Sequence, residues 1–101
     1  DAPVIAGPVL VVGRFVLARP AHHYLPANRK RPTRELRLDA PAYPTGTPDL
    51  DKLARGLLDA ITSVLIRDDA QVAHLDAVKV YETDELREGV RVRITSLEAT
   101  R

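Results

Sequence analysis

The 101-residue sequence contains no cysteine, no tryptophan and no methionine. Without cysteine the protein cannot form a disulfide, use a thiol as a nucleophile or build a zinc site of the cysteine type. The lack of cysteine also agrees with a reducing compartment, and we expect the protein to be cytoplasmic.

Aromatic residues and long apolar runs are scarce as well. The chain has one phenylalanine and three tyrosines, and no apolar run approaches the length that spans a membrane, so we expect no membrane segment. We expect one small domain over residues 1–101, with a small apolar core. A subunit interface would add buried surface, and we therefore expect a homodimer. The chain begins at Asp1 rather than methionine, so we expect that it was processed or that further residues precede it.

The net charge is only +1, but the charges are unevenly distributed. Residues 14–37 carry a net charge of +6, and the rest of the chain carries −5. This division suits a protein that grips DNA or RNA and places a metal ion against it. The alternative is a solvated loop whose charges serve only solubility. The candidate DNA-binding residues are Arg19, Arg29, Lys30, Arg31, Arg34 and Arg37, together with Lys52 and Lys79 further along the chain.

The first regular element is predicted at residues 8–18, which read PVLVVGRFVLA. They are apolar on both faces of a strand, as expected where a strand is covered on both sides or is paired across a subunit boundary. Gly13 indicates a β-bulge. Residues 19–47 form a basic, proline-rich segment, which we predict to be a long functional loop or a partly disordered one.

An amphipathic helix is predicted at residues 48–63. Thr47 and Pro48 are a typical start signal, because the threonine hydroxyl can cap a backbone N–H group and proline fits the first helical position. One stripe of the helix is expected to be buried, and it consists of Leu50, Leu53, Leu57, Ile61 and Val64.

Another face of this helix is polar. Asp51, Arg55 and Asp59 are four residues apart and share that face. Asp59 is placed to pair with Arg55, either behind a functional site or as a simple surface ion pair. Gly56 weakens the helix by about 1 kcal/mol relative to alanine, which predicts a close packing neighbour.

Two further strands are predicted at residues 71–81 and 90–95, joined by a polar connection. We interpret them as an antiparallel hairpin in which Val90, Val92 and Ile94 face the core. The predicted fold class is α/β, or α+β: a small mixed or antiparallel sheet with one main helix.

Four carboxylates stand at the two ends of the predicted helix. Asp49 and Asp51 lie at its start, and Asp68 and Asp69 follow it, where the chain turns into the next strand. Mg²⁺ takes oxygen ligands and completes its coordination with water and substrate phosphate, so all four are candidate metal ligands, with Mn²⁺ as a possible substitute. Each pair alone has a structural explanation, in a first helical turn or in a turn entering a strand. Together, bracketing one helix, they indicate metal-dependent phosphate chemistry.

Histidine and tyrosine side chains give weaker signals. His22 and His23 are adjacent and lack the spacing of metal ligands, so we expect DNA contact or plain exposure. Tyr24 and Tyr43 are expected to pack the loop onto the domain, with stacking on bases as the alternative. Lys79 is expected to contact phosphate or to be solvated.

A compound motif resembles a known family. The string PDLDKLARGLLDAITSVLIRDDAQV, with Lys79 and Tyr81 in the next strand, resembles the RusA-type Holliday junction resolvases of bacteria and their phages. That family shows D-x-D-[NK]-L-x-[KR]-x-x-x-D-A-L and then D-D-x-Q-V at nearly this separation, a pattern far more specific than a lone D-x-D. The resemblance covers residues 48–81, and the upstream strand and loop in character only.

The resemblance implies a small α/β homodimeric endonuclease that uses Mg²⁺ to nick four-way DNA junctions symmetrically, in DNA recombination and repair. By motif position the metal-binding and catalytic carboxylates are Asp49, Asp51 and Asp69, with Asp68 as their acidic neighbour. Arg55 falls where many members have a catalytic lysine. An arginine can hold a phosphate through two hydrogen bonds, but it cannot transfer a proton.

Members of the family also usually carry an N-terminal strand and helix before the segment that matches residues 8–18. This chain lacks them, and we expect part of the DNA-binding surface to be absent with them. Two rival functions stay open: a nucleic-acid-binding or scaffold protein of the same fold that has lost catalysis, and a metal-dependent phosphoesterase acting on flaps or RNA. In none of these cases do we expect a small-molecule cofactor.

Overall fold

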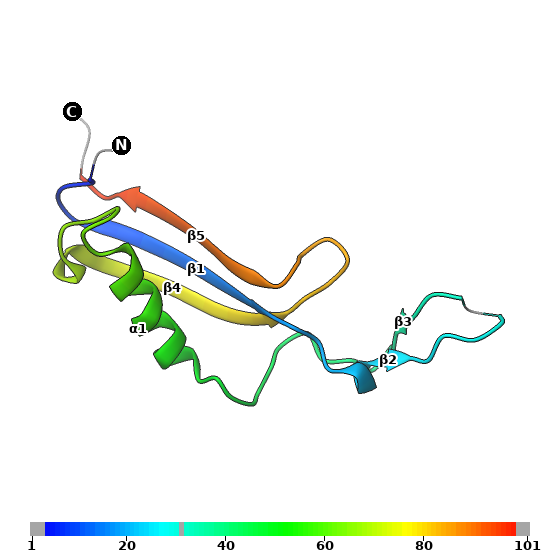
Figure 1. Ribbon diagram of the computed structural model, residues 1–101. Helices are drawn as coiled ribbons and strands as arrows, with labels where there is room; N and C mark the ends of the chain where they lie inside the picture. Colours follow the sequence, from blue (N-terminus) through cyan, green and yellow to red (C-terminus); the bar gives the residue numbers. More distant parts are fainter. Residues whose placement is uncertain (1–3, 31, 99–101) are drawn as a thin grey trace.

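Three long strands form the body of the molecule. The computed structural model describes residues 4–30 and 32–98. β1 (Val9–Leu17) is the middle strand, with β4 (Val72–Tyr81) parallel to it on one edge and β5 (Gly89–Ser96) antiparallel on the other. One main helix, α1 (Leu50–Ile61), lies against one face of this sheet (Figure 1). The predicted fold class, a small mixed sheet with one main helix, is confirmed.

The central position of β1 explains its apolar composition. Val9 and Val11 are fully buried, and Val16, whose place in the strand puts it on the opposite face, is only 2% exposed. Both edges of β1 are paired within the chain. The alternative that this strand pairs across a subunit boundary is therefore wrong.

The predicted hairpin between β4 and β5 is also wrong, because β1 lies between them. Residues 82–88 connect the two strands past the end of β1. Adjacent antiparallel strands are often joined by two residues, whereas this longer connection spans two strand spacings of about 4.8 Å each. The alternating sequence determines which way each side chain faces, but it does not determine the neighbouring strand.

The start of α1 differs from the prediction. Asp49, not Thr47, is the N-cap residue, and Pro48 precedes the cap, joined to Thr47 by a cis peptide bond. Aspartate is at least as frequent as threonine at the N-cap position, although the Asp49 side chain makes no capping hydrogen bond here. Within the residues that the structure describes, no helix has both the length and the apolar character needed to cross a membrane.

The end of α1 is also earlier than predicted. The helix ends at Ile61, and Ser63 has a positive φ of 69° that turns the chain away from the helical path. Val64 is consequently 61% exposed, so its predicted place on the buried stripe is wrong.

The core lies between α1 and the sheet. It consists of Val9, Val11, Phe15, Leu57, Ile61 and Ile66. Gly13 brings the two elements together, because a Cβ atom there would lie 2.7 Å from Leu57 Cδ2. The predicted bulge at Gly13 is absent, and the register shift falls at Val9 and Leu10 instead. Gly56, in contrast, has no atom within 4 Å of its Cβ position, so the close neighbour predicted for it is wrong.

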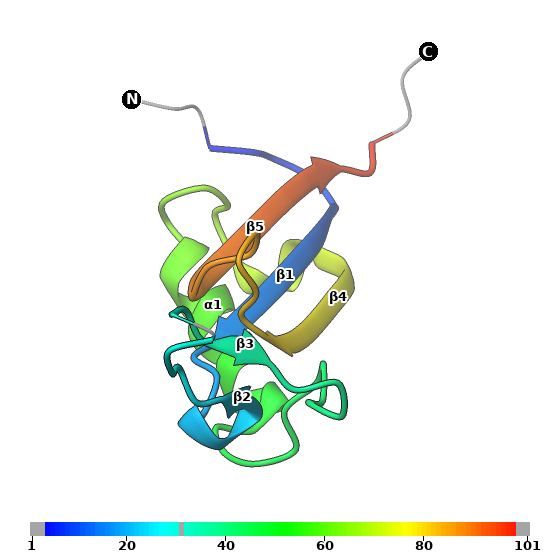
Figure 2. The ribbon, with the colours of Figure 1, turned by 90° about the vertical axis from the view of Figure 1, so that its right-hand side faces the viewer.

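The basic, proline-rich segment projects from the body as an arm, a name that we use for residues 20–41 (Figures 1 and 2). It contains a short 3₁₀ helix, η1 (Ala21–His23), and two short antiparallel strands, β2 (Tyr24–Leu25) and β3 (Glu35–Leu36). The arm gives the molecule its elongated shape, with principal extents of 60 × 25 × 24 Å.

The arm is attached through Arg19, which is 9% exposed. Its Nη1 donates to the carbonyl oxygen of Pro41 at 2.6 Å and its Nε donates to that of Glu82 at 3.1 Å. The guanidinium also lies 5.0 Å from the ring centre of Tyr81. Arg19 thereby ties both ends of the arm to the end of β4.

A candidate metal and nucleic-acid site

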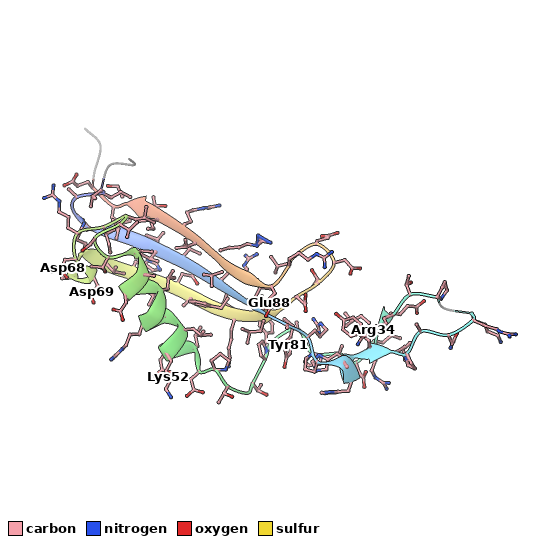
Figure 3. The ribbon with its side chains drawn as sticks, viewed as in Figure 1. Arg34, Lys52, Asp68, Asp69, Tyr81 and Glu88 are labelled. Carbon is pink, nitrogen blue, oxygen red and sulfur yellow. The ribbon has the colours of Figure 1, made fainter. Side chains whose placement is uncertain are left out.

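A groove of about 520 Å³ runs between α1 and β4. Its lining contains three carboxylates, one arginine and three apolar residues: Asp51, Ala54, Arg55, Leu58, Asp59, Asp69 and Leu75. The sequence-predicted Asp51, Arg55 and Asp69 thus line one groove, with Asp51 in the first turn of α1 and Asp69 in a different element. Figure 3 shows Asp69 near one end of α1 and Lys52 near the other.

The helix contributes the first wall of the groove. Asp51 is in the first turn of α1, where the positive end of the helix dipole stabilises a carboxylate. Arg55 and Asp59 follow one and two turns later on the same face, as predicted. Within the described residues they form no ion pair, so the predicted pairing is wrong. An arginine placed before its acidic partner is the less favourable order at this spacing, and Arg55 keeps its charge directed to the groove.

The second wall is built by the Asp68-Asp69 pair. Asp68 caps the 3₁₀ helix η2 (Asp69–Gln71) by accepting a hydrogen bond from Ala70 N at 3.0 Å. Asp69 is the next residue, and it lines the groove. Of the two neighbouring aspartates, Asp68 shapes the turn and Asp69 faces the groove.

Gln71 fixes this turn against the rest of the body. Its Oε1 accepts hydrogen bonds from the backbone N–H groups of Arg67 and Asp68 at 2.8 and 3.0 Å. Its Nε2 donates to the carbonyl oxygens of Ile5 and Gly7 at 2.9 and 2.8 Å. The motif D-D-x-Q therefore contains one groove carboxylate and two residues that hold it in place.

Negative charge is concentrated at this pair, which affects the pKa of each carboxyl group. The hydrogen bond with Asp68, followed by burial and the negative charges of Asp68 and Asp59, raises the pKa of Asp69. The hydrogen bonds from Ala70 N and with Asp69 lower the pKa of Asp68. A cation in the groove would relieve the repulsion that raises the pKa of Asp69.

The donor set fits a hard divalent ion with few protein ligands. Among residues 4–30 and 32–98, no three histidine, cysteine, aspartate or glutamate side chains form a ready-made metal cage. Mg²⁺ needs none, since it is often held by one or two carboxylates with water and substrate phosphate. Asp51 and Asp69 supply two such oxygen donors to one groove. Asp49 lies outside the groove lining, at the N-cap, where its carboxylate makes no capping hydrogen bond.

Most of the other predicted DNA-binding residues lie on the arm. Arg29 and Lys30 are exposed, and Arg31 lies outside the described residues. Arg34 lies over the ring of Tyr24, 4.5 Å from its centre. Arg37 forms an exposed ion pair with Asp39 at 3.2 Å. The arm thus presents several cations away from the body, and Figure 3 shows Arg34 on it.

The remaining candidates have other contacts. Lys79 Nζ donates to the carbonyl oxygens of Gly46 and Pro48 at 2.6 and 3.0 Å, and so holds the chain that leads into α1. Arg19 is buried at the base of the arm, and we leave it out of the proposed DNA-binding surface. Lys52 is exposed on α1.

His22 and His23 have separate surroundings. His22 is exposed, as predicted. His23 is 6% exposed and meets the ring of Tyr81 edge-on at 4.8 Å, so the predicted exposure is wrong for this residue. Burial, together with the positive charges of His22 and Arg19, lowers the pKa of His23.

Two contributions to the site were missed in the sequence. Gln71 was part of the motif but received no role, although Asp-x-x-Gln is a capping-box pattern that predicts the contact with residue 68. Leu75, on β4, completes the apolar side of the groove. No local signal predicts Leu75, because its place depends on the parallel pairing of β4 with β1.

Comparison with known proteins identifies the family. The chain matches the family described as Endodeoxyribonuclease RusA over residues 1–95. A search of curated proteins and a search of solved structures found no significant match. The matched region contains the groove, the arm and all three strands of the sheet, apart from the final residue of β5. The protein therefore belongs to the RusA family of endodeoxyribonucleases.

Proposed function

We propose that this protein is a Mg²⁺-dependent endonuclease that resolves four-way DNA junctions in recombination and repair. Membership in an endodeoxyribonuclease family supports nuclease activity on DNA. The observation that carries the proposal is the groove in which Asp51 and Asp69 come from different elements and share a surface with Arg55. Two carboxylates can hold the ion of a metal-assisted phosphodiester cleavage, and a guanidinium can bind the phosphate.

The roles of the residues follow from their positions. Asp51 and Asp69 would hold the ion, with Asp49 close to the start of the same helix as a further donor. A bound Mg²⁺ supplies an activated water and neutralises charge on the scissile phosphate and the leaving 3′ oxygen. Arg55 would bind a non-bridging phosphate oxygen, since its guanidinium cannot accept a proton. The raised pKa of Asp69 makes this carboxylate a better proton acceptor than its neighbour Asp68, whose pKa is lowered.

The arm would grip the duplex outside the groove. Its exposed cations, including Arg29, Lys30 and Arg34, project from the body and can contact phosphates over a longer stretch than the groove alone. We propose that the protein acts in the cytoplasm of a bacterium or a phage-infected host, where the DNA substrate is located.

Symmetric resolution of a junction requires two active sites, and we propose a two-fold homodimer. β1 cannot supply its interface by edge-to-edge strand pairing, because both of its edges are paired within the chain. The apolar surface beside β5 is a better candidate: Val90 and Val92 are 56% and 41% exposed, and Val90 borders an open groove with Leu53 and Leu57. Light scattering on active protein should give twice the 11.1 kDa chain mass. A monomer under those conditions would favour a single-nick phosphodiesterase.

A cleavage assay tests the activity. The substrates are a mobile four-way junction and a linear duplex of matched length, each with and without Mg²⁺. We expect paired, symmetry-related nicks in the junction only when Mg²⁺ is present. Asp51→Asn should abolish cleavage and leave junction binding intact or tighter, because the substitution removes a charge that repels phosphate. Asp84→Asn, the same change in the exposed 82–88 connection, should cleave like the wild type.

The same assay decides between the proposal and its rivals. A catalytically inactive binding protein is favoured by Arg55 at the position of the family's lysine, and it would bind the junction with no Mg²⁺-dependent cut. Equal cleavage of flaps or RNA would indicate a broader phosphoesterase. Loss of binding together with loss of fold in Asp51→Asn would mean that Asp51 is structural.

A further inference from the structure

The face of the sheet that turns away from α1 carries three arginines that the proposed cleavage does not use. Along β1, Val9, Val11 and Phe15 are buried under α1, so Val12 and Arg14 lie on the opposite face. Among the described residues, α1 is the one α-helix, and it lies on the other face of the sheet, so no α-helix covers this face (Figures 1 and 2). We call it the open face.

The strand register brings the arginines together. Arg14 on β1 stands opposite Arg91 on β5, and Val12 stands opposite Arg93. Directly opposite residues have Cβ atoms about 5 Å apart, and residues two apart on a strand are separated by about 7 Å. The three guanidinium groups therefore gather over a small area, where they line a shallow hollow of about 290 Å³.

Few acidic side chains neutralise the positive charge of this cluster. All three arginines are exposed, and among the described residues none of them forms an ion pair. Asp76, opposite Val12 on β4, is the acidic residue that the register places on this face near them. Like charges placed directly opposite each other on a sheet are destabilising, so the pair Arg14 and Arg91 costs stability unless an anion joins it.

A phosphate backbone is the anion that fits this arrangement. Guanidinium groups bind phosphate oxygens through two parallel hydrogen bonds, and a row of them on a flat, exposed strand can contact successive phosphates. The hollow is open to solvent and lined by three arginines, whereas pockets that bind small molecules enclose most of the ligand and contain few polar groups. The open face is on the other side of the sheet from the candidate cleavage groove. A duplex lying in the groove therefore does not reach it.

We propose that Arg14, Arg91 and Arg93 bind the phosphate backbone of a second duplex of the junction, one that the same subunit does not cut. This inference rests on the proposed function, because a four-way junction is a substrate that offers duplexes in several directions. The open face would then contribute to the preference for branched over linear DNA.

A pair of double variants tests the role of the open face. Arg91→Gln with Arg93→Gln removes two charges from the exposed edge strand and keeps side-chain size. Arg67→Gln with Arg87→Gln is the matched control, since it removes the same charge from exposed positions elsewhere. Circular dichroism and the melting temperature confirm that both fold. Binding to a four-way junction and to a linear duplex is measured without Mg²⁺ at several salt concentrations.

We expect the open-face variant to lose at least about tenfold in junction affinity, and the slope of log affinity against log salt to fall by about 1.8, for two phosphate contacts. The control should change neither quantity, and linear-duplex binding should change little in both. An unchanged junction slope in the open-face variant, or equal losses on junction and duplex, would refute the inference. Wild-type protein without preference for the junction would instead refute the proposed function, and absence of DNA binding would refute both.

A positional probe gives an independent answer. Because the chain has no cysteine, Thr95→Cys places a single thiol on the open face, next to Arg93 in the side-chain alternation. An iron chelate attached there cleaves the nearest DNA through hydroxyl radicals. Cuts concentrated in a duplex of the junction other than the nicked duplex support the inference. Cuts around the scissile phosphates, or none above those from an Asp84→Cys control probe, contradict it.

Discussion

Asp68 and Asp69 are adjacent in the sequence, but one has a structural role and the other lies at the candidate site. Asp68 uses Oδ1 to cap η2, and Asp69 lines the groove. The hydrogen bond that joins them lowers the pKa of Asp68 and raises that of Asp69. The proton affinity of the groove carboxylate is thus set largely by a residue that does not line the groove.

Asp68→Asn should lower the pKa of Asp69. The asparagine keeps an oxygen for the cap and removes the neighbouring negative charge, while its NH₂ group can donate to Asp69. Carboxyl ¹³C chemical shifts followed against pH give the pKa directly. Mn²⁺ binding should then persist to lower pH than in the wild type, because protons compete with the ion for Asp69. An unchanged titration of Asp69 would show that the pair is not coupled through this bond.

Two glycines provide a matched test of packing between α1 and β1. Gly56→Ala should raise the free energy of unfolding by about 1 kcal/mol, because the helix gains propensity and the space at this position is open. Gly13→Ala should lower it by about 1–3 kcal/mol, because the new methyl group would overlap Leu57 Cδ2. Urea denaturation measures both. If Gly13→Ala were the more stable of the two variants, the helix would move away from β1 without a loss of free energy of unfolding.

At the scale of elements, local sequence patterns predict the helix and the strands but not the order of the strands in the sheet. The helix and the three long strands were all found, since each has its own periodicity of apolar residues. The order of strands was not found. A strand, a helix and a second strand in sequence indicate a parallel pair joined by a crossover, yet the alternation in residues 90–95 was read as evidence for a hairpin.

The candidate site could be predicted in part for the same reason. Asp51, Arg55 and Asp59 were placed on one face by helical spacing alone, and Asp69 was added through its motif. The burial of Arg19 and the carbonyl contacts of Lys79 could not be foreseen, because they depend on where the arm and the segment leading into α1 meet β4. A basic residue in a sequence shows charge, but it does not show whether that charge is presented to a ligand.

The attachment of the arm should depend on pH through His23. Burial lowers its pKa, so the folded state favours the neutral ring and the unfolded state binds more protons below pH 6.5. The stabilising contribution is therefore present above pH 6.5 and declines as the pH falls, while Arg19 and His22 oppose the added charge and Asp39 favours it.

Hydrogen exchange measures this attachment. The amide of Tyr81, which donates to Ala42 O at 3.0 Å beside the His23 ring, should lose protection between pH 7.5 and 5.5 after correction for the intrinsic rate. His23→Gln should remove the pH dependence of this protection. If the wild-type protection is constant over that interval, the neutral ring is not needed for attachment.

At the scale of the whole molecule, the arm should contribute to the salt dependence of DNA binding. Arg29→Ala with Lys30→Ala should reduce the slope of log affinity against log salt by about 1.8, because two phosphate contacts are lost. Arg67→Ala with Arg87→Ala serves as the charge-matched control. Fluorescence anisotropy with a labelled junction provides the affinities. If the slope of log affinity against log salt were equal for both variants, the basic segment would be a solvated loop that does not bind DNA.

The attachment of the arm at one end of the sheet has a consequence for the shapes of DNA that the protein accepts. Both ends of the arm meet the body at Arg19, at one end of the sheet, while the groove runs along α1 and β4. Any rotation at this attachment is magnified at the tip of the arm in proportion to its length. The angle allowed between a duplex on the arm and a duplex in the groove therefore depends on Arg19 with its carbonyl partners and on the contact of His23 with Tyr81. Residues remote from both contacts would help decide which junction geometries are admitted.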